Sequence, residues 1–223
     1  MTDNETLVRR LDAVVDAALA EKRIVGGMIL VARDGETVYS RAAGLADRET
    51  GRPVRNDTIF RYASLTKPMV SVAALALAED GVIALDDPVT RHLPDFRPKL
   101  PDGTEPVITL RHLMTHTSGL TYDFMEPPES AYHQTGISNG FDVVGVSMED
   151  NLRRIVAWPL NFAPGAAWNY SVSTDVLGAV LARATGTSLS EVVRRKVTGP
   201  LGLGDTGFSV TDPDRLAVAY ADG

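Results

Sequence analysis

Apolar residues recur at three- and four-residue spacing near the start of the chain, which predicts an amphipathic helix around residues 7–19. Two strand-like runs follow, residues 27–32 and residues 36–42, with Asp34-Gly35 between them. An Asp-Gly pair between two such runs is typical of a tight hairpin turn. The first part of the chain is therefore predicted to form a helix followed by two antiparallel strands.

A second apolar run has no polar face. After the polar loop 45–55, residues from about Ser64 to Asp80 follow a helical pattern in which almost every position beyond the first turn is apolar, and Gly81 can end the helix. A helix that is apolar all round is usually buried. We expect this helix at the centre of the molecule.

The later part of the chain has few strand patterns. Helices are predicted near residues 110–115, 148–157, 173–185 and 188–197. This order of elements suggests an α+β fold. We assign 1–84 to the N-terminal part of an α/β domain, 85–207 to a mostly helical domain, and 208–223 to the start of a return to the first domain. A hairpin alone is too small to cover a helix, so further strands are expected in the later region or after Gly223.

Composition narrows the classes of partner. The 223 residues are 44% hydrophobic, enough for a sizeable core, and the net charge of -7 argues against a nucleic-acid or anionic-membrane partner. The chain has no cysteine, which excludes disulfides, thiolate nucleophiles and cysteine-bound zinc. The longest apolar runs are too short for a membrane span, and the N-terminal region lacks the pattern of a signal peptide. We therefore predict a cytoplasmic location.

The clearest candidate for chemistry is Ser64 with Lys67, in the stretch YASLTKP. Residues at i and i+3 lie on the same face of a helix, so the lysine amine can reach the serine hydroxyl. A serine needs a neighbouring base to become a nucleophile, and burial or a like charge can make lysine such a base. The same residues also suit the polar first turn of an ordinary helix that starts at Ser64, with Pro68 in that turn. The local pattern leaves both interpretations open.

Ser138, in the stretch GISNG, matches the nucleophile-elbow pattern of α/β-hydrolases. That motif requires a preceding strand, and residues 125–134 do not have a strand pattern. Such enzymes also place the catalytic histidine after the serine, whereas all four histidines of this chain precede Ser138. His112 and His116 are four residues apart but lack a third metal ligand, so we predict structural roles for them and no metal site.

A tyrosine provides a third candidate. Tyr170 lies in the predicted loop AWNYSVS, ahead of the helix 173–185. A lone loop tyrosine is usually a packing residue. Beside a lysine ammonium, however, the phenolate is favoured and the side chain can act as a base.

Four stretches together are similar to one known family: RYASLTKP (61–68), LRHLMTHTSGL (110–120), FAPGAAWNYSVSTDVLG (162–178) and GPLGLGDTGF (199–208). With the first helix and hairpin, the resemblance covers nearly the whole chain. The chain resembles the superfamily of serine β-lactamases and penicillin-binding proteins, specifically its class C-like branch and the family VIII carboxylesterases. The resemblance implies a β-lactamase/transpeptidase-like fold, in which an antiparallel sheet has flanking helices beside a mostly helical region.

The resemblance also implies roles for particular residues. Ser64 corresponds to the acyl-enzyme nucleophile, Lys67 to its proton-accepting partner, and Tyr170 to the tyrosine that moves a proton between serine, leaving group and water. Tyr122 and Trp168 are expected to line the acyl or alcohol pocket, as substrate-binding residues. Ser138 corresponds to a serine that is not the nucleophile in these esterases. No metal or cofactor is implied.

Two departures from the family pattern shape the expected activity. Val172 stands where β-lactamases and peptidases usually have Asn, which favours ester substrates over β-lactams or peptides. Family members are longer, so the last strands, a third motif and one oxyanion-hole N–H are expected after Gly223. We predict a carboxylesterase that cleaves short-chain esters. A β-lactamase, a D-alanyl-D-alanine carboxypeptidase and a non-catalytic penicillin-binding sensor are the competing interpretations.

Overall fold

The computed structural model describes residues 3–141 and 145–220. The chain forms two compact units, Met1–Ala63 with Ser209–Gly223, and Ser64–Phe208. Among the described residues, no single helix is long and apolar enough to cross a membrane. The helices Ser173–Thr185 and Leu189–Thr198 reach that length and apolar character only when taken together, and the chain bends by 83° between them. The division groups the predicted central helix with the helical unit, whereas the sequence-based division placed it with the sheet. The domain boundaries 1–84, 85–207 and 208–223 stay a prediction.

The first unit contains the helix and the hairpin that the pattern predicts. Helix α1 spans Asp3–Ala20, and strands β1 (Gly26–Arg33), β2 (Glu36–Asp47) and β3 (Arg52–Pro53) form an antiparallel sheet in that order. Asp34 and Gly35 have φ values of 52° and 82°, which is the backbone of a type I′ turn. Because the twist of this turn matches that of the two strands, it fixes the pairing of β1 with β2.

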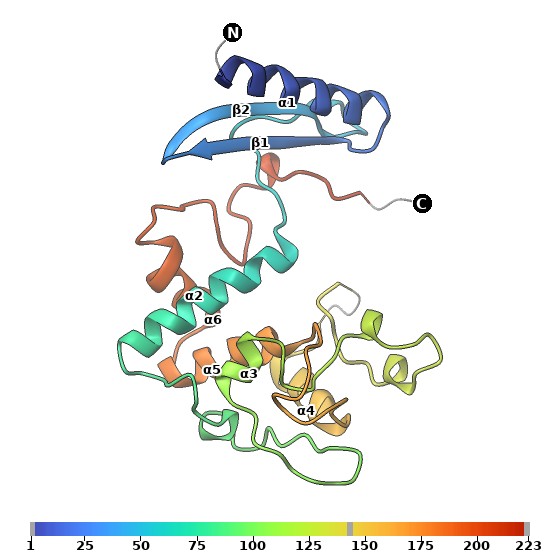
Figure 1. The fold of residues 1–223 in the computed structure, drawn as a ribbon, viewed down its shortest axis with the longest axis vertical. Coiled ribbons are helices and arrows are strands. Elements are labelled where there is room, and N and C mark those ends of the chain that lie inside the picture. Colours follow the sequence, from blue (N-terminus) through green and yellow to red (C-terminus); the bar gives the residue numbers. More distant parts are fainter. Residues whose placement is uncertain (1–2, 142–144, 221–223) are drawn as a thin grey trace. The chain divides into compact units, whose positions relative to one another are not determined.

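Helix α1 runs along the β1–β2 hairpin (Figure 1). Arg41 of β2 donates to Asp12 at 2.9 Å and to Asp16 at 2.5 Å, and the Tyr39 hydroxyl also donates to Asp12. The hydrogen bonds from Tyr39 and Arg41 hold the pKa of Asp12 below its usual value. These contacts join the exposed edge of α1 to β2, while Val15 and Ala18 are buried.

Further strand-like contacts are limited. The described residues after the hairpin contribute two isolated bridges, Ile59 with Leu216 and Pro88 with Thr109. Val218 also donates its N–H to the Ala46 carbonyl of β2 at 2.8 Å. The segment around 216–218 therefore lies beside the first sheet without forming a named strand.

The second unit is helical. Its α-helices are α2 (Thr66–Glu79), α3 (Leu110–Met114), α4 (Met148–Ala157), α5 (Ser173–Thr185) and α6 (Leu189–Val193). The described residues also form short helical turns, namely η1 (Ala63–Leu65), η2 (Val89–Arg91), η3 (Asp123–Met125), η4 (Ala131–Gln134), η5 (Arg194–Thr198) and η6 (Pro213–Arg215). The helices predicted from the sequence in this region are confirmed, and with the antiparallel sheet they confirm the α+β class.

Two of these helices start at serine caps, which explains why their first residues were predictable. The Ser147 hydroxyl accepts the N–H of Asp150 at the start of α4, and the Ser188 hydroxyl accepts that of Glu191 at the start of α6. Gly186, with φ at 67°, ends α5 in the left-handed conformation that glycine adopts without strain.

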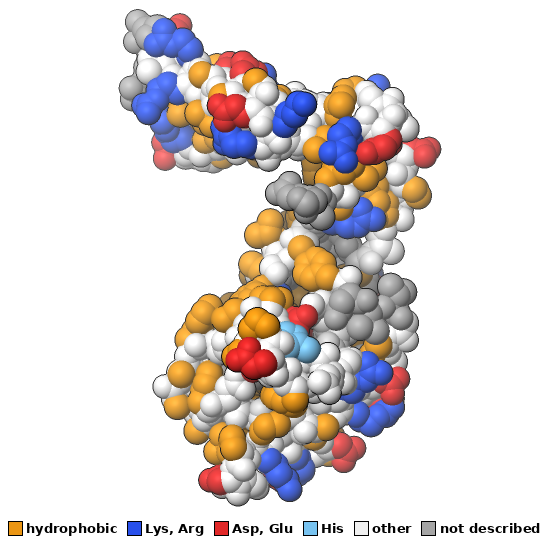
Figure 2. Space-filling model, turned by 90° about the vertical axis from the view of Figure 1, so that its right-hand side faces the viewer, with side chains coloured by type: hydrophobic (Ala, Val, Ile, Leu, Met, Phe, Trp, Pro, Cys, Tyr) orange, Lys and Arg blue, Asp and Glu red, His pale blue; other side chains and the backbone are white. Residues whose placement is uncertain are grey.

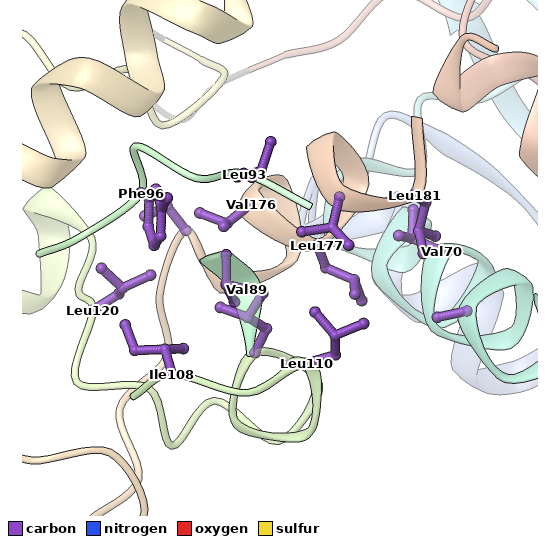
Figure 3. Close-up of a cluster of buried hydrophobic side chains, with 14 of the residues drawn as sticks. Val70, Val89, Leu93, Phe96, Ile108, Leu110, Leu120, Val176, Leu177 and Leu181 are labelled. Carbon is purple, nitrogen blue, oxygen red and sulfur yellow. The ribbon is translucent and has the colours of Figure 1, made fainter. Parts of the chain in front are cut away.

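Helix α5 lies at the centre of the hydrophobic core of the second unit. Val176, Leu177 and Leu181 are completely buried and pack with Leu110 and Val70 in one cluster (Figure 3). Helices α2, α3 and α6 all contact α5. Burial of these side chains from water is the main favourable contribution to the folding of this unit.

The prediction that the helix from about Ser64 to Asp80 is buried all round is wrong. Helix α2 buries one face, with Val70, Ala73, Ala74 and Leu77 against α5 and its neighbours, whereas Val72 and Leu75 are 48% and 44% exposed. The pattern alone could not show this, because apolar residues on every face indicate only that each face tolerates burial. Which face is covered depends on tertiary packing.

Two loops of the second unit pair through their backbones. The segment that follows α3 accepts hydrogen bonds at His116 from Asn169, at Thr117 from Gly165 and at Gly119 from Asn161. Gly119 has φ at 88°, and a Cβ atom there would lie 2.2 Å from the carbonyl oxygen of Phe162. Only glycine fits this close approach of two backbones.

We expect Gly119→Ala to lower the free energy of unfolding by about 2–5 kcal/mol, since a left-handed backbone and a steric clash are combined. Gly103→Ala is the matched control, because Gly103 has φ at 85° with no atom within 4 Å of its Cβ position. The control should lose only about 1–2 kcal/mol. Denaturant unfolding measures both values. Equal losses would contradict the close approach at Gly119.

Candidate active site

Ser64 and Lys67 meet at the start of α2. Ser64 lies in η1, directly before the helix, and Lys67 is the second residue of α2. The Nζ of Lys67 donates to the Oγ of Ser64 at 3.3 Å. Ser64 is exposed and Lys67 is half-buried. The i, i+3 spacing therefore brings the two groups together as predicted, although α2 begins at Thr66 rather than at Ser64.

The backbone directly before Ser64 is strained. Ala63 has φ at 45°, a left-handed conformation that is uncommon for a residue with a Cβ atom. Such residues persist where the surrounding structure holds them, and they are frequent at functional sites. Pro68 is the third residue of α2, so its missing N–H falls in the first turn, where no intrahelical hydrogen bond is lost.

Tyr170 approaches the same serine from a distant part of the chain. Its hydroxyl donates to the Oγ of Ser64 at 2.7 Å, across 106 residues of sequence. The Nζ of Lys67 is also 4.9 Å from the centre of the Tyr170 ring. The structure thus brings together all three side chains that the sequence analysis proposed as catalytic, around one exposed hydroxyl.

Tyr122 lies beside these groups and is buried. The Nζ of Lys67 is 5.4 Å from the centre of its ring, and the rings of Tyr122 and Tyr170 are 5.3 Å apart. The Tyr122 hydroxyl donates to Asp175 at 3.2 Å. Burial, first, and the charge of Asp175 raise the pKa of Tyr122 well above its usual value, so this hydroxyl stays protonated.

Trp168 lies at the rim of this group of side chains. It is 64% exposed, and its ring meets that of His116 edge to face at 6.3 Å. The substrate-binding roles of Tyr122 and Trp168 stay a prediction.

A hydrogen-bonded network connects the Tyr170 loop to the segment after α3. The Nδ1 of His116 is 3.2 Å from the Ser171 hydroxyl, and a chain of contacts at 2.7 Å continues to Ser173 and then to Ser118. The ring of His116 also packs against that of Tyr170 at 4.8 Å. Burial and the charge of Lys67 lower the pKa of His116, which favours the neutral imidazole.

Two residues at this site were missed by the sequence analysis. Asp175 lies in the first turn of α5, and Phe124 stacks on Tyr122 with ring centres 4.8 Å apart. Asp175 carried a signal that could have been used, because it is the only charged residue in the otherwise apolar and small-residue run 172–182. Phe124 carried none, since an aromatic residue in a loop has many possible neighbours.

Ser138 is in a loop between η4 and α4, as predicted. Along the described chain the element before it is a helical turn rather than a strand, and its hydroxyl accepts the N–H of Gly140 at 3.1 Å. Asn151 holds the Ser138 backbone through two hydrogen bonds. The GISNG stretch therefore lacks the strand–turn–helix geometry of a nucleophile elbow.

His112 has a structural contact too. Its ring accepts the backbone N–H of Thr109, whose hydroxyl in turn accepts the N–H of His112, so the pair forms a capping box at the start of α3. Within residues 3–141 and 145–220, no group of three or more His, Cys, Asp or Glu side chains is arranged to hold a metal ion.

The geometry places a tyrosine hydroxyl and a lysine amine within hydrogen-bond distance of one serine hydroxyl. A serine with an adjacent base is the arrangement that nucleophilic catalysis requires. The ionised form of Tyr170 is able to take the Ser64 proton at this distance, and the resulting phenol is able to return it.

Curated relatives of the chain include an esterase. The chain is 54% identical over 99% of its length to "Esterase EstB" of Burkholderia gladioli, and covers 56% of that protein. It is 30% identical over 95% of its length to the "ML-236A carboxylate methylbutanoyltransferase" of Penicillium citrinum, and covers 54% of it. The chain thus spans about half the length of these relatives.

A solved structure agrees with the sequence comparison. "EstCE1, a hydrolase with promiscuous acyltransferase activity", superposes with a TM-score of 0.95 at 43% identity, over 99% of this chain and 58% of that one. The predicted β-lactamase/transpeptidase-like fold is therefore confirmed. The family model described as Beta-lactamase matches residues 11–223. The chain belongs to the Beta-lactamase family.

Proposed function

We propose that the protein is a serine hydrolase that cleaves carboxylic esters through an acyl-enzyme on Ser64. The observation that carries the proposal is the contact of one exposed serine Oγ with both the Tyr170 hydroxyl at 2.7 Å and the Lys67 Nζ at 3.3 Å. The 54% identity to an esterase supports the same reaction class.

The reaction uses two steps. In the first, Tyr170 acts as a phenolate that the positive charge of Lys67 stabilises. Ser64 Oγ attacks the ester carbonyl carbon, its proton moves to the Tyr170 oxygen, and the negative charge passes to the former carbonyl oxygen. Tyr170 then gives the proton to the departing alkoxide, so that the alcohol leaves and the acyl group stays on Ser64. In the second step, water attacks the acyl carbon, Tyr170 takes its proton, and Ser64 leaves with that proton.

The oxyanion needs hydrogen-bond donors. The backbone N–H of Ser64 is one candidate, and the second donor stays a prediction. No metal or cofactor takes part in this scheme, and the partner is a small ester. The cytoplasmic location also stays a prediction.

Two features favour esters with an apolar group. Val172 is buried. The resemblance implies an Asn at this position in β-lactamases and peptidases, so this chain has no side-chain amide there for a β-lactam or peptide. Phe124, Met125 and Trp168 are 57%, 44% and 64% exposed, and hydrophobic side chains are numerous at the surface of the second unit (Figure 2). The ring of Phe124 is 6.3 Å from that of Tyr170, and exposed apolar side chains near the site suit an acyl or alcohol group that leaves water on binding.

Acyl transfer is the second candidate. An alcohol that replaces water in the second step gives a new ester, with the same residues in the same roles. The relative from Penicillium citrinum is named as a methylbutanoyltransferase, and the name of EstCE1 includes acyltransferase activity. β-Lactam hydrolysis, peptidase activity and penicillin sensing would each use the same serine, so substrate comparison has to separate them from ester hydrolysis.

We expect Ser64→Ala to lower kcat/KM for a short p-nitrophenyl ester by about 10³-fold or more, because the nucleophile is lost. Ser138→Ala is the matched control, since it removes the other motif serine, and it should keep the wild-type rate. Spontaneous and enzymatic hydrolysis are compared by release of p-nitrophenol. Loss of activity in the Ser138 variant with retention in the Ser64 variant would reverse the choice of nucleophile, and retention in both would favour a non-catalytic sensor.

We also expect the wild-type protein to turn over p-nitrophenyl butyrate with a higher kcat/KM than a chromogenic cephalosporin. The physical reason is Val172, which provides no hydrogen bond to the amide of a β-lactam. Adding a primary alcohol should yield some transesterified product, which chromatography separates from the free acid. Faster hydrolysis of the cephalosporin would contradict the ester assignment.

A further inference from the structure

Asp175 is a half-buried carboxyl group that the two-step scheme does not use. It lies in the first turn of α5 between the buried residues Val172 and Val176. Its Oδ2 accepts the hydroxyl of Tyr122 at 3.2 Å. Placing a carboxyl group among apolar residues costs free energy, so a retained acid in this position requires partners.

Lys67 has two tyrosine neighbours with different hydroxyl partners. Its Nζ lies 4.9 Å from the ring centre of Tyr170 and 5.4 Å from that of Tyr122. The Tyr170 hydroxyl points to Ser64, whereas the Tyr122 hydroxyl points to Asp175. Both rings lie at a similar distance from the ammonium group, so its charge acts on both. The hydroxyl partners therefore decide which tyrosine can serve as a base.

Asp175 and Lys67 also interact as charges. Burial raises the pKa of Asp175, while attraction to Lys67 and the hydrogen bond from Tyr122 act in the opposite direction. The charge of Asp175 in turn helps to raise the pKa of Tyr122. The carboxyl group is thus linked to α2 through Lys67 and to the segment after α3 through Tyr122.

We propose that Asp175 is a positioning residue that fixes Tyr122 as a hydrogen-bond donor, balances the charge of Lys67, and so leaves Tyr170 as the base at Ser64. This inference rests on the proposed ester hydrolysis. It assigns a role to an acidic side chain that contacts Tyr122 and acts on Lys67, and it explains why two adjacent tyrosines differ in function.

The inference predicts a specific effect on pH dependence. The titratable groups around Asp175 and its partners are Lys67 on α2, His116 and Tyr122 after α3, Tyr132 on η4, and Tyr170 before α5. Removing a negative charge favours the deprotonated form of each neighbour, so each pKa falls. Both limbs of the profile of kcat/KM against pH should then move to lower pH, by about one unit.

Asp175→Asn tests this effect, because the amide keeps the size of the side chain and an oxygen that accepts the Tyr122 hydroxyl. Asp175→Glu keeps the charge while changing the geometry, so its profile should stay at the wild-type pH even where its rate is lower. Asp87→Asn is the control for loss of a buried carboxylate, since Asp87 bonds to Ala84, Arg91 and His92 rather than to the site. It should affect thermal unfolding and leave the profile in place.

A shift in Asp175→Asn alone supports the inference. An unshifted profile in Asp175→Asn, or an equal shift in Asp87→Asn, overturns it. If the asparagine variant does not fold, Asp175→Ser removes the charge with a smaller side chain and is held to the same outcomes. Failure of the proposed function is a separate result, because Ser64→Ala would then retain ester hydrolysis whatever the Asp175 variants show.

Discussion

The hydrogen bond from Tyr170 to Ser64 is the contact on which the site depends. It joins a residue before α5 to one before α2, so it forms only when two distant loops take fixed positions. Backbone pairing of the Tyr170 loop with the segment after α3 supplies that constraint, and Gly119 permits it by letting the two chains approach. The buried face of α2 then holds the other partner against α5.

Lys67 is the residue that interacts with most of the polar and charged groups around this contact. The ammonium is 3.3 Å from the Ser64 hydroxyl, faces two tyrosine rings, and interacts with Asp175 and His116. Neutral His116 and protonated Tyr122 add no charge of their own. In the proposed reaction the phenolate of Tyr170 is the base that Lys67 stabilises, because that tyrosine, and not Tyr122, is bonded to Ser64.

Local chemistry made much of this structure predictable from sequence. The Asp34-Gly35 turn, the serine caps at Ser147 and Ser188, and the spacing of Ser64 and Lys67 each depend on residues close together in the chain. The sequence analysis grouped Ser64, Lys67 and Tyr170 because Tyr170 lies in a family motif, and the structure places the three side chains together. The contact of Tyr170 with Ser64 joins residues that are far apart in the chain, so no local sequence pattern predicts it.

The parts that were not predicted depend on packing between distant segments. The exposed face of α2 and the contact of Asp175 with Tyr122 are decided by which elements meet, and a helical pattern does not contain that information. The position of Phe124 against Tyr122 is of the same kind. An acid in an apolar helix was the one available signal, and it pointed to a partner without identifying it.

The central claim is that Ser64 is the nucleophile, activated where Tyr170 and Lys67 meet. The most direct test is covalent labelling with a p-nitrophenyl phosphonate ester, which forms a stable serine adduct, followed by peptide mapping by mass spectrometry. The account predicts one phosphonyl group, on the peptide that contains Ser64. A label on Ser138 or another residue, or no label in folded protein that hydrolyses esters, would contradict it.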